Sequence, residues 1–152
     1  MDLVPRVKAA FGTHPHGFLI TPADAGWRHA RLVRHVTIDD DLSVWIGTSR
    51  RSRKVAETRR WGHATYAVED RASVAAVMLS GRRRGRGRSA DHPLGRRVRG
   101  RSLPQVLPAT ITRWCALPDE IKLIAFAHGV HPDPYRLVSQ RFALTPAGWL
   151  AA

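Results

Sequence analysis

The stretch RHVTIDDDLSVWIGTSRRSRK, residues 34–54, combines a predicted β-hairpin with the start of a helix. Over residues 29–38 the side chains at 32, 34, 36 and 38 fall on one face of a strand, and those at 31, 33, 35 and 37 on the other. Aspartates at 39–41 mark a turn, and residues 42–46 return as the second strand. Residues 49–60 then predict a helix that begins at Ser49 or Ser52 and ends at Trp61 and Gly62.

Short elements fill the rest of the chain. Apolar spacing predicts a helix over 3–11, and short apolar runs predict strands over 18–21, 65–68, 110–117, 120–127 and 140–144. The apolar run 72–79 predicts a central strand covered on both faces, and Pro118 with Asp119 predicts a turn. Many short strands with few helices indicate a mainly β protein, a small β-barrel, and 152 residues fit one domain spanning 1–152.

Composition excludes several classes of protein. Hydrophobic residues make up 43% and charged residues 24% of the chain, as in folded globular proteins, which excludes disorder of the whole chain. The longest apolar stretch, Val74 to Leu79, is far shorter than the roughly 20 residues of a membrane-spanning helix. The first residues lack the apolar segment of a secretory signal, and the single Cys115 permits no intrachain disulfide. We therefore expect a cytoplasmic protein that does not associate with membranes.

The positive charge is local. The formal net charge is +13, but residues 82–101 hold nine arginines and one aspartate, which leaves +5 for the other 132 residues. An arginine-rich segment can bind nucleic acid or another polyanion, and it can also be a solvated loop or a misread coding stretch. The segment has no interleaved aromatic residues for base stacking, so we expect an Arg/Gly-rich loop and no nucleic-acid partner.

Residues 48–54, TSRRSRK, place cations at 50, 51, 53 and 54 around the start of the predicted helix. Cations at that end oppose the helix dipole and repel one another. A bound anion explains the arrangement, because hydroxyls of Thr48, Ser49 and Ser52 can donate to phosphate oxygens while Arg53 and Lys54 neutralise them. The alternative interpretation is a solvated basic turn in an arginine-rich chain.

These residues resemble the flavin-binding signature of the pyridoxamine 5′-phosphate oxidase-like proteins, which are FMN-binding split barrels. That signature has an Arg on one strand, a second strand ending in Thr, and Ser-Arg-Lys at a helix start. Arg34, Thr48 and the triplet Ser52-Arg53-Lys54 match it, with the Thr-to-Lys spacing of six. The segment 114–149 resembles the general-stress-protein-like subgroup. The resemblance covers residues 14–81 and 110–149.

The resemblance implies a homodimer with the flavin at its interface. Arg34 and Lys54 would contact the FMN phosphate with Ser52 and Arg53 beside them. Thr48 would offer its hydroxyl, and Val36 and Thr37 would offer backbone groups to the isoalloxazine. A deazaflavin is the alternative cofactor, since related enzymes with this fold use one.

The implied activity is that of a flavin-dependent oxidoreductase. Oxidation of vitamin B6 is not expected, because no residues match the substrate-binding Arg and His of the true oxidases. The core strand also has Ala75, Ala76 and Val77 where the family often has a polar side chain, so one flavin contact is missing or replaced. The rival hypothesis from another class is a non-enzymatic polyanion binder that uses residues 82–101.

No catalytic residue or metal site is predicted. The pairs His14 with His16 and His128 with His131 have short spacings, but no cysteine or acidic ligands accompany them.

Overall fold

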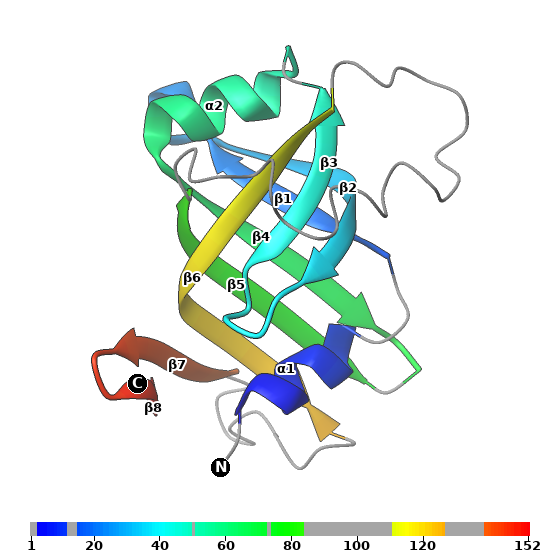
Figure 1. The fold of residues 1–152 in the computed structure, drawn as a ribbon, viewed down its shortest axis with the longest axis vertical. Coiled ribbons are helices and arrows are strands. Elements are labelled where there is room, and N and C mark those ends of the chain that lie inside the picture. The colour runs from blue at the N-terminus through cyan, green and yellow to red at the C-terminus, as the bar shows by residue number, and fades with distance from the viewer. Residues whose placement is uncertain (1–2, 12–14, 50, 73, 84–110, 127–138) are drawn as a thin grey trace.

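Six antiparallel strands close into a barrel, and a helix lies at each end of it in the view of Figure 1. The computed structural model describes residues 3–11, 15–49, 51–72, 74–83, 111–126 and 139–152. In chain order the elements are α1 (Leu3–Phe11), β1 (His16–Pro22), the 3₁₀ turn η1 (Asp24–Gly26), β2 (Arg28–Ile38), β3 (Val44–Ser49), α2 (Arg53–Trp61), β4 (His63–Asp70), β5 (Ala75–Arg83), β6 (Ile111–Ala125), β7 (Gln140–Thr145) and β8 (Gly148–Ala151).

The sheet order is β3-β2-β1-β4-β5-β6-β7-β8, and a further pairing of β3 with β6 closes the ring. β6 makes this closure possible because it is 15 residues long. Its residues 111–116 pair with β3, and its residues 116–125 pair with β5. The β7–β8 hairpin continues the sheet from β6 outside the closed ring (Figure 1). The architecture is a split barrel, which confirms the expected mainly β fold.

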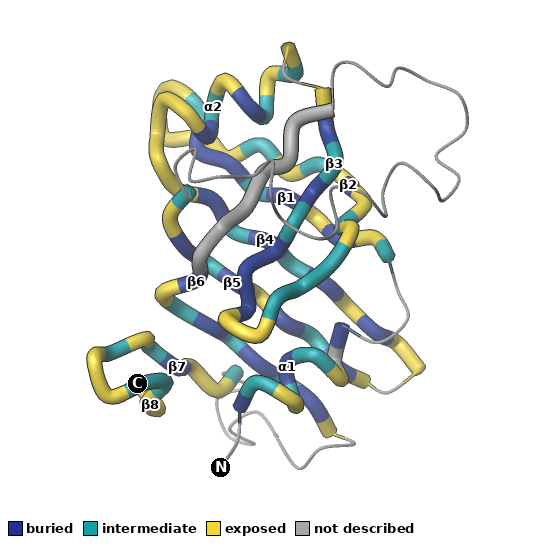
Figure 2. Tube along the Cα trace, in the orientation of Figure 1, coloured by how far each residue is buried: buried dark blue, intermediate teal, exposed yellow. Residues whose placement is uncertain are grey.

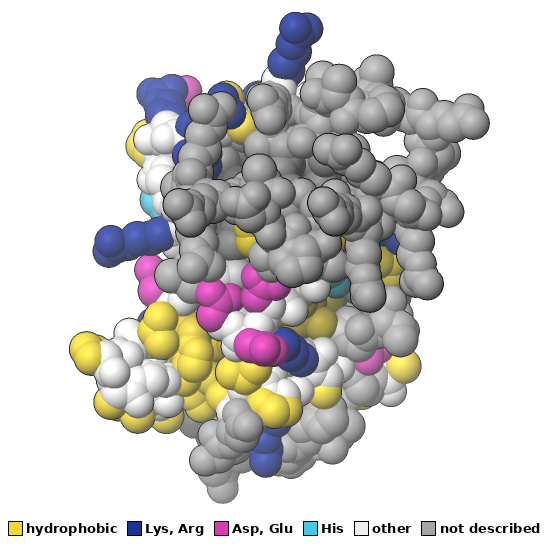
Figure 3. All heavy atoms as spheres, in the orientation of Figure 1, with side chains coloured by type: hydrophobic (Ala, Val, Ile, Leu, Met, Phe, Trp, Pro, Cys, Tyr) yellow, Lys and Arg dark blue, Asp and Glu magenta, His cyan; other side chains and the backbone are white. Residues whose placement is uncertain are grey.

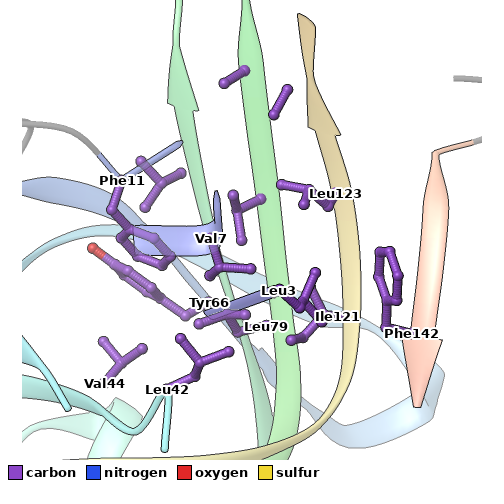
Figure 4. Packing of buried hydrophobic residues seen from close by; sticks show 14 of the residues in the cluster. Leu3, Val7, Phe11, Leu42, Val44, Tyr66, Leu79, Ile121, Leu123 and Phe142 are labelled. Carbon is purple, nitrogen blue, oxygen red and sulfur yellow. The ribbon is translucent and has the colours of Figure 1, made fainter. Parts of the chain in front are cut away.

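Burial alternates along the strands, as Figure 2 shows, because successive strand side chains point to opposite faces. The inward side chains form one core that includes Val44, Tyr66, Leu79 and Ile121 (Figure 4). α1, whose existence the helical spacing predicted, adds its apolar face to one end of this core; its buried residues are Leu3, Val7 and Phe11.

An aromatic cluster joins α1 to the barrel wall. The rings of Phe11 and Tyr66 stack with centroids 6.0 Å apart, and the Tyr66 hydroxyl lies 2.8 Å from Nδ1 of His35. Burial raises the pKa of the Tyr66 hydroxyl. Burial also lowers the pKa of His35, and the nearby charges of His16 and Arg34 add to this effect. This cluster therefore stays uncharged near neutral pH.

Three sequence predictions are corrected by the pairing. Pro118 and Asp119 do not form a turn, because β6 runs through both. Ser80 pairs with Glu120 and Gly81 with Pro118, so Asp119 is the extra residue of a β-bulge. β5 is central in the sheet, but burial alternates along it and Met78 is exposed in the single chain, so it is not covered on both faces.

The third correction concerns the faces of β2. A register shift between His35 and Thr37 places a bulge at Val36. The alternation therefore changes phase: Arg34 is exposed, whereas Ile38 packs against the core instead of sharing that outer face.

The helix starts later than position 49, because Ser49 ends β3 and Ser52 is the N-cap.

Some expectations fall outside the described residues. Arg82 and Arg83 end β5, but the rest of the predicted loop 82–101 is not among the residues that the structure describes. His14, His128 and His131 also lie outside them. The short strand β8 was not predicted from the sequence.

We predict that Gly17→Ala destabilises the barrel. A Cβ at this position would lie 2.5 Å from the Ala67 carbonyl oxygen and 2.6 Å from the ring and hydroxyl of Tyr66. Backbone and a fully buried ring have little room to move, so the free energy of unfolding should fall by about 1–3 kcal/mol. Thermal or urea unfolding followed by circular dichroism measures this loss. An unchanged midpoint would contradict the close approach.

Candidate functional site

The junction of β3 and α2 brings hydroxyl groups together at a helix start. Thr48 is buried near the end of β3, and its Oγ1 lies 3.3 Å from Oγ of Ser52. Ser52 is the N-cap of α2, but its side chain makes no capping hydrogen bond. In most helices such a side chain accepts from a backbone N–H of the first turn. The start of α2 therefore keeps a donor-rich surface that an anion can use.

Lys54 follows in the first turn of α2 and is partly buried. Burial lowers the pKa of its ammonium group, and the nearby positive charge of Arg31 lowers it further. No carboxylate pairs with Lys54 among the residues that the structure describes. Arg53, in contrast, is mostly exposed and its Nε lies 3.4 Å from Oε1 of Glu57. Among the described cations of this helix start, Lys54 is thus the one that a bound anion would stabilise most.

The neighbouring strand β2 carries the other predicted residues. Arg34 is exposed and has no acidic partner within the described part of the chain. The bulge leaves Val36 without a partner in the register between β2 and β3, so its backbone groups are outside that ladder. Thr37 pairs with Trp45, whose indole Nε1 donates to a carboxylate oxygen of Asp39 at 2.6 Å.

The predicted site residues fall into two groups. Thr48, Ser52, Arg53 and Lys54 meet at the β3–α2 junction, and Arg34, Val36 and Thr37 lie on the adjacent strand β2. Among the residues that the structure describes, no hydrogen bond or ion pair links the two groups. A ligand that uses both groups would reach from the β3–α2 junction to the adjacent strand β2.

Glu57 is a polar centre that sequence reasoning missed. It belongs to α2, and its side chain is only 11% exposed and faces β1 and β2. Thr21 donates to Oε2 at 2.6 Å, Arg31 donates to the same oxygen at 2.5 Å, and Nδ1 of His29 lies 2.8 Å from Oε1. Burial acts to raise the pKa of this carboxyl, but the hydrogen bonds and the charge of Arg31 prevail and lower it to about 2. The partners are distant in sequence, so no local spacing reveals them.

The charges around α2 are mainly positive. In Figure 3 the Lys and Arg side chains at the top left of the molecule lie over this helix. The helix itself contributes Arg53, Lys54, Arg59 and Arg60 against the single acid Glu57. This surface suits a negatively charged ligand group.

The described ranges hold no group of three or more His, Cys, Asp or Glu side chains that could bind a metal ion. They also contain no helix with the length and apolar character needed to cross a bilayer.

No protein-family model matches the sequence, and a comparison with curated proteins finds no match. Solved structures do match the fold. A pyridoxamine 5′-phosphate oxidase-related, FMN-binding protein from Nostoc punctiforme superposes with a TM-score of 0.68 at 10% identity, over 100% of this chain and 96% of its own. A protein related to general stress protein 26 (pyridoxinephosphate oxidase family) from Clostridium acetobutylicum gives a TM-score of 0.64 at 13% identity, over 94% and 95% of the two chains.

A protein named for another ligand also matches the fold. A haem-binding protein from Mycobacterium smegmatis gives a TM-score of 0.60 at 14% identity, over 82% of this chain and 54% of that one. The fold is thus a split barrel like that of the pyridoxamine 5′-phosphate oxidase-related proteins among these structures. The suspected resemblance is therefore supported at the level of the fold.

We predict that Glu57→Gln lowers stability in a pH-dependent way. Because the folded pKa of Glu57 is about 2, below its ordinary value of 4.5, the ionised carboxylate stabilises the fold above pH 4.5, and this stabilisation is lost as pH falls towards 2. Above pH 5 the variant should lose about 1.5–3 kcal/mol, the contribution of hydrogen bonds to a charged group. Urea unfolding at a series of pH values measures the difference, which should shrink towards zero near pH 2. A pH-independent difference would contradict the assignment.

Proposed function

We propose that this protein binds FMN and acts as a flavin-dependent oxidoreductase. In this proposal Lys54 and Arg34 hold the phosphate, with Ser52, Thr48 and Arg53 beside them. The observation that carries it is the partly buried ammonium of Lys54, which has no acidic partner in the described ranges and lies beside an N-cap whose side chain caps nothing. A phosphate dianion would supply the missing negative charge and accept from both groups.

The donor set fits the two parts of such a cofactor. The hydroxyls and cations at the β3–α2 junction suit a phosphate, whereas the bulge at Val36 leaves backbone groups outside the β2–β3 ladder on the neighbouring strand. Those groups, with Thr37 next to them, suit the polar edge of a flat heteroaromatic ring. When bound, the isoalloxazine would supply the redox chemistry, and this chain would bind and orient it.

The alternatives have distinguishable spectra. FMN, a deazaflavin and haem absorb visible light differently, and all three differ from a colourless polyanion binder. Purified protein, with and without added FMN, is the first sample to measure. Protein that is colourless and does not take up FMN would favour the polyanion hypothesis. We propose a small molecule other than vitamin B6 as the substrate. The cytoplasmic location of the protein stays a prediction.

We propose in addition that the protein is a homodimer through the outer face of the barrel. Four side chains form a row across four strands, because Leu32 pairs with Phe18, Phe18 with Ala67, and Ala67 with Met78. Phe18 is 52%, Leu32 64% and Met78 37% exposed in the single chain. The exposed Arg34 lies two residues from Leu32 on the same strand, so a second copy on this row would cover the proposed flavin site.

We predict that Lys54→Ala weakens FMN binding by about 10- to 150-fold, since the change removes a charge-assisted contact worth about 1.5–3 kcal/mol. Riboflavin lacks the phosphate, so its affinity should change little. Fluorescence titration of the apoprotein with each compound measures both constants. Arg51→Ala is the matched control, because Arg51 is exposed and has no assigned phosphate contact. Equal losses for Lys54→Ala and Arg51→Ala, or parallel losses for riboflavin, would contradict the assignment of Lys54 to the phosphate.

We predict that Phe18→Glu converts the dimer to a monomer, because it places a charge in the middle of the apolar row. Sedimentation of the unchanged protein at micromolar concentration should give about twice the 16.9 kDa mass of one chain. Leu150→Glu, an exposed position on β8 outside the row, is the control and should stay dimeric. A monomeric unchanged protein that binds FMN with full affinity would refute the shared site.

A further inference from the structure

We propose that Glu57 is a positioning residue that fixes the first turns of α2 for phosphate binding, an inference that rests on the proposed flavin function. Glu57 itself does not contact the ligand in this proposal. It acts through the contacts that tie the helix to β1 and β2.

The carboxylate of Glu57 is saturated with partners from three elements. Oε2 accepts from the hydroxyl of Thr21 on β1 and from Arg31 on β2. Oε1 lies 2.8 Å from Nδ1 of His29 on β2 and 3.4 Å from Nε of Arg53 on α2 itself. Two of these partners also contact each other, because Arg31 donates to the Thr21 hydroxyl at 2.9 Å. Such a network holds one orientation of the helix on the barrel end.

The same contacts decide which cation remains for a ligand. Glu57 lies three residues after Lys54, a spacing at which side chains on a helix are neighbours. The structure nevertheless pairs Glu57 with Arg31, Arg53 and His29, and gives Lys54 no carboxylate among the described residues. Glu57 thus neutralises Arg31, the cation that acts on Lys54, without occupying Lys54.

A separate ion pair ties down the other end of the helix. Arg60, in the last turn of α2, lies 2.8 Å from a carboxylate oxygen of Asp24 in η1. Val55 and Thr58 are the buried residues of α2. Of the Glu57 network and the Asp24 pair, only the Glu57 network is near the predicted phosphate-binding residues. Loss of the Glu57 network should therefore affect Lys54, and loss of the Asp24 pair should not.

Positioning and simple electrostatics predict opposite signs for Glu57→Gln. Removal of a negative charge near a phosphate site raises the local positive potential, so charge alone predicts tighter FMN binding. A positioning role predicts weaker binding despite that gain, because the first turn of α2 is no longer held. The sign of the change in affinity therefore separates the two explanations.

The experiment compares FMN and riboflavin affinities of the folded apoproteins by fluorescence titration at pH 7.5. For Glu57→Gln we expect FMN to bind about tenfold more weakly and riboflavin to be nearly unchanged. Asp24→Asn removes the same charge and an ion pair to the same helix, and should leave both affinities unchanged. Unchanged or tighter FMN binding by Glu57→Gln, or an equal loss in Asp24→Asn, would overturn the inference.

A second variant covers the case in which Glu57→Gln does not fold. Thr21→Val keeps the shape of a fully buried side chain and removes its hydrogen bonds to Glu57 and Arg31. It should weaken FMN by about fivefold and spare riboflavin; no change would overturn the positioning role. Lys54→Ala distinguishes failure of the proposed function from failure of this inference. If Lys54→Ala leaves FMN binding intact, the proposed function fails. If Lys54→Ala weakens FMN binding but Glu57→Gln and Thr21→Val do not, only the positioning role of Glu57 fails.

Discussion

β3 is held along both edges, by β2 on one side and by β6 on the other, and this double pairing closes the barrel. Its last residues, Thr48 and Ser49, pair with the first residues of β6, so the end of β3 cannot fray independently of the ring. Ser52, the N-cap of α2, lies three positions after Ser49. The position of the basic helix start is therefore set by long-range strand pairing, which a short surface loop alone would not provide.

Charge at this end of the barrel is distributed unevenly. The nearly buried carboxylate of Glu57 pairs with two arginines and a histidine. Asp24 pairs with Arg60 in the last turn of α2, whereas the partly buried Lys54 pairs with neither acid. A fold that minimised only its own electrostatic energy would pair that lysine. The cost is explained if a ligand brings the counter-charge, as in binding sites whose residues are arranged for a partner and not for the isolated chain.

The sequence was sufficient for the parts of the molecule that depend on local patterns. Alternation predicted the β2–β3 hairpin, and helical spacing predicted α1, because neighbouring residues alone determine those patterns. It failed where pairing overrides a local signal. Pro118 and Asp119 have the sequence of a turn. Pairing with β5 nevertheless keeps β6 extended through both residues, with a bulge at Asp119. The bulge at Val36 and the network of Glu57 have no local signature, since both depend on residues brought together by closure of the barrel.

The closed ring also determines where the sheet can meet another strand. In the described part of the chain, every strand from β1 to β7 pairs with a neighbour on both sides over at least part of its length, and β8 ends the strand order. The outer edge of β8 is four residues long. A short edge offers few unsatisfied backbone groups for edge-to-edge association, the route by which β proteins commonly polymerise. The outer edge of β8 should therefore contribute little to fibrillar aggregation of the folded protein, even though the barrel wall carries exposed apolar side chains.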